Sequence, residues 1–104
     1  MADFYFEDFV AGDVQTFGSH EMTREEIVTF AQEFDPQPMH LTEEGGKASI
    51  LGGLAASGWQ SCAVMMRLIC DGFLLRTASM GSPGVTSNTW KAPVFPGDVL
   101  TLKR

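Results

Sequence analysis

A run of apolar residues near the middle of the chain constrains the fold most strongly. Ser57-Gly58-Trp59-Gln60 has the pattern of a helix capping box, with Ser at the N-cap and Gln three residues later. The helix that it starts is predicted to run from Trp59 to about Leu75, with apolar side chains on nearly every face. A helix of that kind is expected to be buried all round. A curved sheet wrapped around it would bury it, which predicts an α+β domain.

A connection stiffened by prolines lies upstream of this helix. Residues 23–26 (TREE) form another capping box and start a first helix. That helix must end near Phe34, because Pro36 disfavours helical geometry at the preceding Asp35. Residues 35–40 (DPQPMH) are therefore predicted to form a rigid, non-helical loop.

Strand-forming segments flank the helices. Residues 14–22 and 85–91 each predict a strand, residues 99–103 predict the start of another, and residues 42–53 contain a short helix. Two or three strands are too few to enclose so apolar a helix. We therefore expect residues 1–104 to form a single domain that lacks its C-terminal strands, which residues absent from this chain or a partner would supply.

The charge of the chain narrows the range of partners. Asp and Glu number 13 against 7 Lys and Arg, so the formal net charge is −6. A field of that sign repels phosphate backbones and anionic lipids, so we expect neither nucleic acid nor a membrane surface as a partner. The longest apolar stretch is interrupted by Arg67 and Asp71 and is not expected to span a bilayer. Residues 1–10 lack the basic region of a secretory signal.

Two cysteines, Cys62 and Cys70, fall on the predicted long helix. Eight residues of helix separate them by about 12 Å, which is too far for a disulfide. We expect them to be buried structural thiols, and a reducing cytoplasm accommodates such thiols.

Three motifs occur in a characteristic order. Asp35, Pro38 and His40 form a D-x-x-P-x-H loop, residues 52–59 (GGLAASGW) form a small-residue turn into the long helix, and residues 93–98 (PVFPGD) form a Pro-rich turn. This order resembles the MaoC-like hydratases, in which an Asp is followed by Asn-Pro and by a His five residues after the Asp. The resemblance covers nearly the whole of this chain. Here the Asn is Gln, and the small Ser-Gly pair before the Asp is Glu-Phe.

The resemblance implies a hot-dog fold, in which a long central helix is wrapped by an antiparallel sheet. It also implies hydration of a 2-enoyl thioester, which needs a base, a proton donor and an oxyanion hole. Asp35 and His40 are the expected acid–base pair, and the sequence leaves open which takes the first proton. The backbone N–H of Gly58, at the first turn of the long helix, is the expected oxyanion hole. Ser57 and Trp59 are the expected substrate contacts.

The same resemblance implies an acyl thioester of coenzyme A or acyl-carrier protein as substrate, and a place in fatty acid metabolism. The acyl chain would run in a tunnel beside the helix, completed across the interface of a homodimer or a larger homo-oligomer. No cofactor is expected. His20 and His40 with nearby carboxylates do not show the ligand spacing of a metal site, so no metal is expected.

Simpler roles stay open for several of these residues. Ser57 can serve as an N-cap alone, and Gly58 as a packing glycine. His20 is expected to be an exposed strand residue. The cations Lys47, Arg76 and Lys91 can meet coenzyme A phosphates or can be solvated surface residues.

Two other functions compete with the hydratase. A thioesterase on the same fold would use a carboxylate to direct water to the carbonyl carbon, although the spacing from Asp35 to His40 argues against it. The other is a non-catalytic hot-dog module that binds a partner or ligand, which the shortage of strands motivates.

Overall fold

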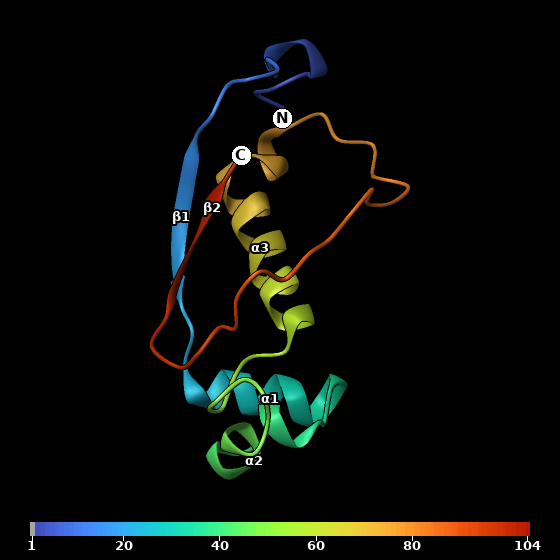
Figure 1. Ribbon diagram of the computed structural model, residues 1–104. Coiled ribbons are helices and arrows are strands. Elements are labelled where there is room, and N and C mark those ends of the chain that lie inside the picture. Colours follow the sequence, from blue (N-terminus) through green and yellow to red (C-terminus); the bar gives the residue numbers. More distant parts are fainter. Residues whose placement is uncertain (1) are drawn as a thin grey trace.

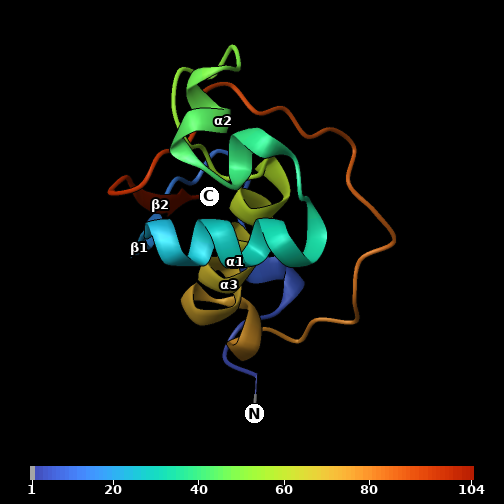
Figure 2. The ribbon, with the colours of Figure 1, turned by 90° about the horizontal axis from the view of Figure 1, so that it is seen from below.

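The computed structural model of the chain describes residues 2–104. A two-stranded sheet lies along one side of a long helix, and two shorter helices lie at the N-terminal end of that helix (Figure 1). In chain order the elements are η1 (Phe6–Asp8), β1 (Thr16–Glu21), α1 (Arg24–Phe34), η2 (Pro38–His40), α2 (Glu43–Lys47), α3 (Gly58–Gly72), η3 (Leu74–Arg76) and β2 (Val99–Lys103). Seen from below, α1 crosses the end of α3 (Figure 2).

The sheet has two strands, which come from opposite ends of the sequence. β1 pairs antiparallel with β2, with Thr16 opposite Lys103 and Glu21 opposite Val99. The strands predicted at residues 14–22 and 99–103 are confirmed. The strand predicted at residues 85–91 is wrong, because this stretch is exposed and has no strand beside it among the described residues. A strand forms only with a hydrogen-bonded neighbour. The segment instead belongs to a long loop that bulges away from α3 and returns to it, where Trp90 contacts Gly58 (Figures 1 and 2).

The first helix, α1, follows its predicted capping pattern in part. Thr23 Oγ1 accepts a hydrogen bond from the Glu26 N–H, as a Thr N-cap should. The Glu26 carboxylate does not return to Thr23, because it contacts His20 Nε2 on β1 at 2.6 Å. His20 is accordingly on a strand, as predicted, but half-buried and paired instead of exposed. Ile27 of α1 and Leu54 are fully buried in the same core cluster. This packing fixes the position of α1 and therefore of the loop that follows it.

The long helix α3 is covered on one side only. Gln60 and Leu68 are its buried residues, whereas Trp59, Met65 and Met66 are 61%, 46% and 44% exposed. The expectation that the helix is buried all round is therefore wrong for this chain, because two strands cannot reach around it. The short helix α2 is also confirmed, although it ends at Lys47, well before residue 52. None of the helices in residues 2–104 has the length and hydropathy of a membrane span.

Both cysteines lie on α3 as free thiols. The absence of a disulfide agrees with the prediction from their spacing. Cys62 and Cys70 are half-buried, however, so the prediction of buried thiols is wrong. Their partial exposure follows from the incomplete cover of the helix that carries them.

Candidate functional site

The loop from Asp35 to His40 is held in one shape by its own backbone. Asp35 lies just past the end of α1, with φ −151° and ψ 70°, and Pro38 occupies the start of the 3-10 turn η2. The Gln37 N–H donates to Asp35 O at 2.8 Å, and the His40 N–H donates to Gln37 O at 2.9 Å. Prolines and hydrogen bonds together bring the side chains of Asp35 and His40 to the same side of the loop.

The ring of His40 is oriented by the segment that precedes α3. It is only 5% exposed, and its Nδ1 lies 2.7 Å from Ala55 O. A carbonyl oxygen only accepts, so Nδ1 carries the hydrogen of this bond. In the neutral ring Nε2 therefore bears the lone pair, and this atom lies 3.5 Å from Asp35 Oδ2. The Ala55 N–H donates back to Met39 O at 3.1 Å, which ties the two segments together.

The Asp35 carboxylate accepts a hydrogen bond on each oxygen. Ser57 Oγ donates to Oδ2 at 2.7 Å, and Gln37 Nε2 donates to Oδ1 at 2.7 Å. The Ser57 bond is the main cause that lowers the pKa of Asp35 below its ordinary value, and the Gln37 bond and the nearby His40 ring act in the same direction. Burial opposes them and is outweighed. Asp35 is therefore a carboxylate at neutral pH.

The start of α3 lies directly beside this pair. Ser57 is fully buried, and its Oγ also accepts the Trp59 N–H at 3.3 Å, so it caps α3 and holds Asp35 at once. Gly58 is the first residue of α3, and within residues 2–104 no oxygen accepts its N–H. The positive end of the helix dipole adds to the attraction of this N–H for negative charge.

A tryptophan from the long loop covers Gly58. Trp90 Nε1 donates to Gly58 O at 2.9 Å, and its ring lies edge-on to Trp59 with centroids 5.0 Å apart. A Cβ at position 58 would collide with the Trp90 ring, so this approach requires glycine. Gly58 thus serves as a packing glycine while it presents an unpaired N–H.

These residues border one hollow of about 390 Å³. Asp35, His40, Gly58 and Trp59 line it on one side, and residues 90–94 line it on the other. Ser57 does not line it. Asp35 Oδ2 and His40 Nε2 are close enough for a single water to hydrogen-bond both. Gly58, whose N–H opens α3, lines the same hollow, so a water at the pair and a carbonyl at the start of the helix would share one cavity.

Two residues of this site were not predicted as functional. Gln37 was noted only as a departure from a motif, and Trp90 was placed in a strand. The sequence could have indicated the role of Gln37, because its amide stands two residues after Asp35 in a rigid loop and can therefore reach that carboxylate.

Of the three cations considered for phosphate binding, Lys91 alone borders this hollow. No group of three His, Cys, Asp or Glu side chains in residues 2–104 could hold a metal ion.

Comparison with known proteins gives consistent matches. The family model described as the MaoC-like domain matches residues 8–103. The uncharacterized protein YdeM of Bacillus subtilis is 35% identical over 95 residues, which cover 90% of this chain and 67% of YdeM.

Two solved structures are similar over almost the whole chain. The MaoC-like dehydratase of Rhodospirillum rubrum has a TM-score of 0.84 and 40% sequence identity. The match covers 96% of this chain and 68% of the dehydratase. The monoamine oxidase regulatory protein of Archaeoglobus fulgius has a TM-score of 0.80 and 23% sequence identity. The match covers 99% of this chain and 70% of the regulatory protein. These matches confirm the hot-dog fold that the sequence predicts. This chain spans about two thirds of the length of each relative.

Proposed function

Because this chain belongs to the MaoC-like domain family, we propose that it is a hydro-lyase that interconverts a 2-enoyl thioester and a (R)-3-hydroxyacyl thioester. One observation carries the proposal. A carboxylate and an imidazole lie 3.5 Å apart, beside an unpaired N–H at the start of a helix. These are the groups that water addition to an enoyl thioester requires.

The hydration proceeds through the two side chains and one water. Asp35, kept ionised by its hydrogen bonds, accepts one hydrogen of the water and orients its oxygen toward C3. His40 Nε2, which has the lone pair, takes the other proton as the new C3–O bond forms. The electrons of the C2=C3 bond move toward the thioester, and the His40 imidazolium then returns the proton to C2. One water is consumed, and both residues end as they began.

The thioester oxygen gains negative charge during this step, and the Gly58 N–H is the group that stabilises it. The N–H is at the positive end of α3 and has no other acceptor in residues 2–104. The Trp59 and Trp90 rings lie edge-on to each other beside it and give this end of the hollow an apolar surface. The reaction so described requires no covalent intermediate.

Two substitutions test the proposal with crotonyl-CoA as substrate. Asp35→Asn removes the charge that orients the water, and His40→Ala removes the proton acceptor. Each is expected to lower kcat by about 10²- to 10⁴-fold, measured as loss of the enoyl absorbance. Circular dichroism should show both variants folded.

Asp71→Asn is the matched control, because Asp71 is an exposed partner of Arg67 on α3 and lies outside the hollow. It is expected to retain wild-type activity. Turnover that survives in both site variants would exclude this acid–base pair. Release of free thiol instead of water addition would identify a thioesterase.

A further inference from the structure

The carbonyl that orients the His40 ring belongs to a short segment that precedes α3, and three N–H groups anchor this segment. Those of Ala55 and Ala56 donate to backbone carbonyls at 3.1 and 2.8 Å. The Leu54 N–H donates to a side chain instead, at 3.3 Å from Oε1 of Glu43. Glu43 is therefore the one anchor of the three that a substitution can remove without changing the backbone.

Glu43 reaches the Leu54 N–H from the start of α2. Leu54 is buried, and Glu43 supplies the only acceptor of its N–H in the described chain. A buried N–H without an acceptor destabilises a fold, so a carboxylate at this place is useful to it. The Leu54 N–H is also the main cause that lowers the pKa of Glu43 below its ordinary value. Glu43 is therefore ionised at neutral pH.

Two further contacts keep this carboxylate in place. Arg24 of α1 donates from Nη2 to the other oxygen, Oε2, at 3.2 Å. This ion pair is exposed, so it orients the carboxylate more than it stabilises the fold. Gly46 of α2 lies so close to Gly53 that a Cβ on it would collide with the Gly53 backbone. The helix that carries Glu43 is therefore seated directly on the chain that leads to Leu54.

The tautomer of His40 depends on where this segment lies. Ala55 O accepts from Nδ1 at 2.7 Å, which keeps the hydrogen on Nδ1 and the lone pair on Nε2, 3.5 Å from Asp35 Oδ2. If the carbonyl moved away, the hydrogen could transfer to Nε2. The ring would then present a donor to the water instead of an acceptor. The position of one carbonyl therefore decides whether His40 can act as a base.

We propose that Glu43 is a positioning residue for His40. Its carboxylate holds the Leu54 N–H, and thereby holds the Ala55 carbonyl where it selects the tautomer with a free Nε2. The consequence for catalysis rests on the hydro-lyase function proposed above. The tautomer itself is a property of the free protein and can be measured without a substrate.

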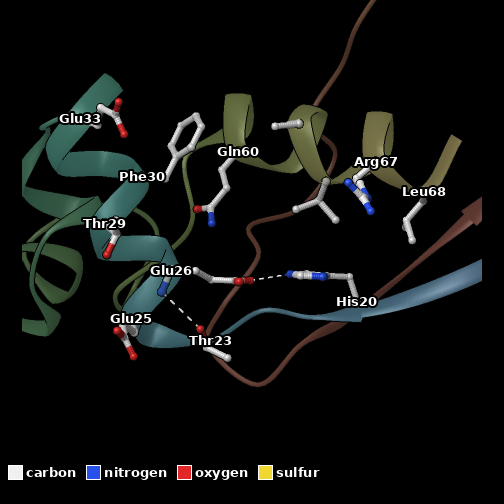
Figure 3. Close-up of a pocket in the computed structure, with 12 residues that line it drawn as sticks. His20, Thr23, Glu25, Glu26, Thr29, Phe30, Glu33, Gln60, Arg67 and Leu68 are labelled. Atoms are coloured by element: carbon white, nitrogen blue, oxygen red, sulfur yellow. Dashed lines mark hydrogen bonds and ion pairs between the residues drawn. The ribbon is translucent and has the colours of Figure 1, made fainter. Parts of the chain in front are cut away.

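Long-range ¹H–¹⁵N NMR spectra of the histidine rings test the proposal at neutral pH. The signals of His40 should change from those of a single Nδ1–H tautomer in the wild type to an average of two tautomers in Glu43→Leu, which has no acceptor for the Leu54 N–H. The chain has two histidines, and the other is an internal reference. His20 contacts Glu26 at 2.6 Å beside a separate hollow of about 620 Å³ between α1, β1 and α3 (Figure 3). Its signals should not change.

Kinetics with crotonyl-CoA measure the consequence for the reaction. Glu43→Leu should lower kcat about tenfold with KM little changed, because the base is misoriented while the hollow is intact. Glu43→Gln keeps a side-chain oxygen as acceptor and should restore both kcat and the His40 tautomer. Glu44→Leu is the matched control, because it removes the same charge from an exposed neighbour in α2. It should behave as wild type in both measurements.

An unchanged His40 tautomer in Glu43→Leu would overturn the proposal, even with a lower melting temperature, because Glu43 would then stabilise the fold alone. If Glu43→Leu does not fold, Glu43→Asp provides the same readout, since its shorter side chain withdraws the carboxylate from Leu54. Absence of turnover by the wild-type protein would overturn the hydro-lyase proposal instead, and the NMR spectra would still decide the role of Glu43.

Discussion

Ser57 joins two roles at a single oxygen atom. Its hydroxyl accepts the Trp59 N–H and so caps α3, while its hydrogen goes to Asp35 Oδ2. Because that hydrogen is committed to Asp35, and because the residue is fully buried, Ser57 acts on the substrate through the carboxylate that it positions. Ser57 was expected to contact the substrate directly. We propose instead that it is a positioning residue for Asp35.

Ser57→Ala tests this role through pH dependence. The Ser57 bond is the largest cause of the lowered pKa of Asp35, so its removal should raise that pKa toward the ordinary value of 3.8. The acid limb of the kcat/KM profile for crotonyl-CoA should therefore move to higher pH. An acid limb that does not move would show that the hydroxyl does not control Asp35. Ser57→Thr, which keeps the hydroxyl, is the control and should retain the wild-type profile.

The same substitution should also change the pH dependence of stability. The folded-state pKa of Asp35 lies below its unfolded value, so its hydrogen bonds stabilise the fold above about pH 4 and are lost as pH falls through the folded pKa. Ser57→Ala should lower the free energy of unfolding by about 1–3 kcal/mol at pH 7. The deficit should shrink at acid pH. Urea unfolding at both pH values measures it.

At the scale of the elements, the chain follows its sequence wherever neighbouring residues decide the structure. The caps at Thr23 and Ser57 and the break before Pro36 depend on local chemistry, and all three are where the sequence predicts them. Residues 85–91 have strand composition but depend on a distant neighbour, and the described chain provides none. Contacts with distant residues decide strands and burial, so local patterns predict them less well.

The residues of the candidate site also divide into those that local sequence predicts and those that depend on distant contacts. Asp35 and His40 were identified through the resemblance of their loop to the family motif, and two prolines in that short loop made their proximity predictable. The partners that orient them, Ala55 and Ser57, lie 15 and 22 residues away and required the fold. Glu43 was predicted only as part of a short helix, and its contact with the segment before α3 required the fold as well.

The first turn of α3 offers a direct test of the proposed oxyanion hole. Gly58→Ala and Gly58→Pro both add a Cβ that meets the Trp90 ring, but only proline removes the N–H. Proline is tolerated at the first position of a helix, so α3 should still form. We expect Gly58→Pro to reduce kcat by about 10²- to 10³-fold below that of Gly58→Ala.

Gly84→Ala controls for the loss of a glycine, because a Cβ there meets open space. It should behave as wild type in the same crotonyl-CoA assay. Equal activities of the alanine and proline variants at position 58 would assign that glycine to packing alone.

At the scale of the whole molecule, the chain exposes more surface than a globular monomer of its mass. Its accessible surface is 7469 Å², whereas 11.3 kDa predicts about 5,700 Å². Its radius of gyration is 16.0 Å against about 13 Å for a compact domain of this length. The surplus is larger than the roughly 800 Å² that each partner buries in an ordinary protein interface. Much of it is apolar, on α3 and on the loop that carries Trp90.

We therefore expect a homodimer or larger homo-oligomer in solution, formed through the uncovered side of α3. Sedimentation velocity over a range of concentrations should show a species at least twice the mass of the chain. Met65→Glu together with Met66→Glu should shift the population toward monomer, because charges on an apolar interface oppose its burial. Glu44→Lys changes charge on an exposed residue of α2 and should leave assembly unchanged. A monomer at every concentration would show that this surface stays open to solvent.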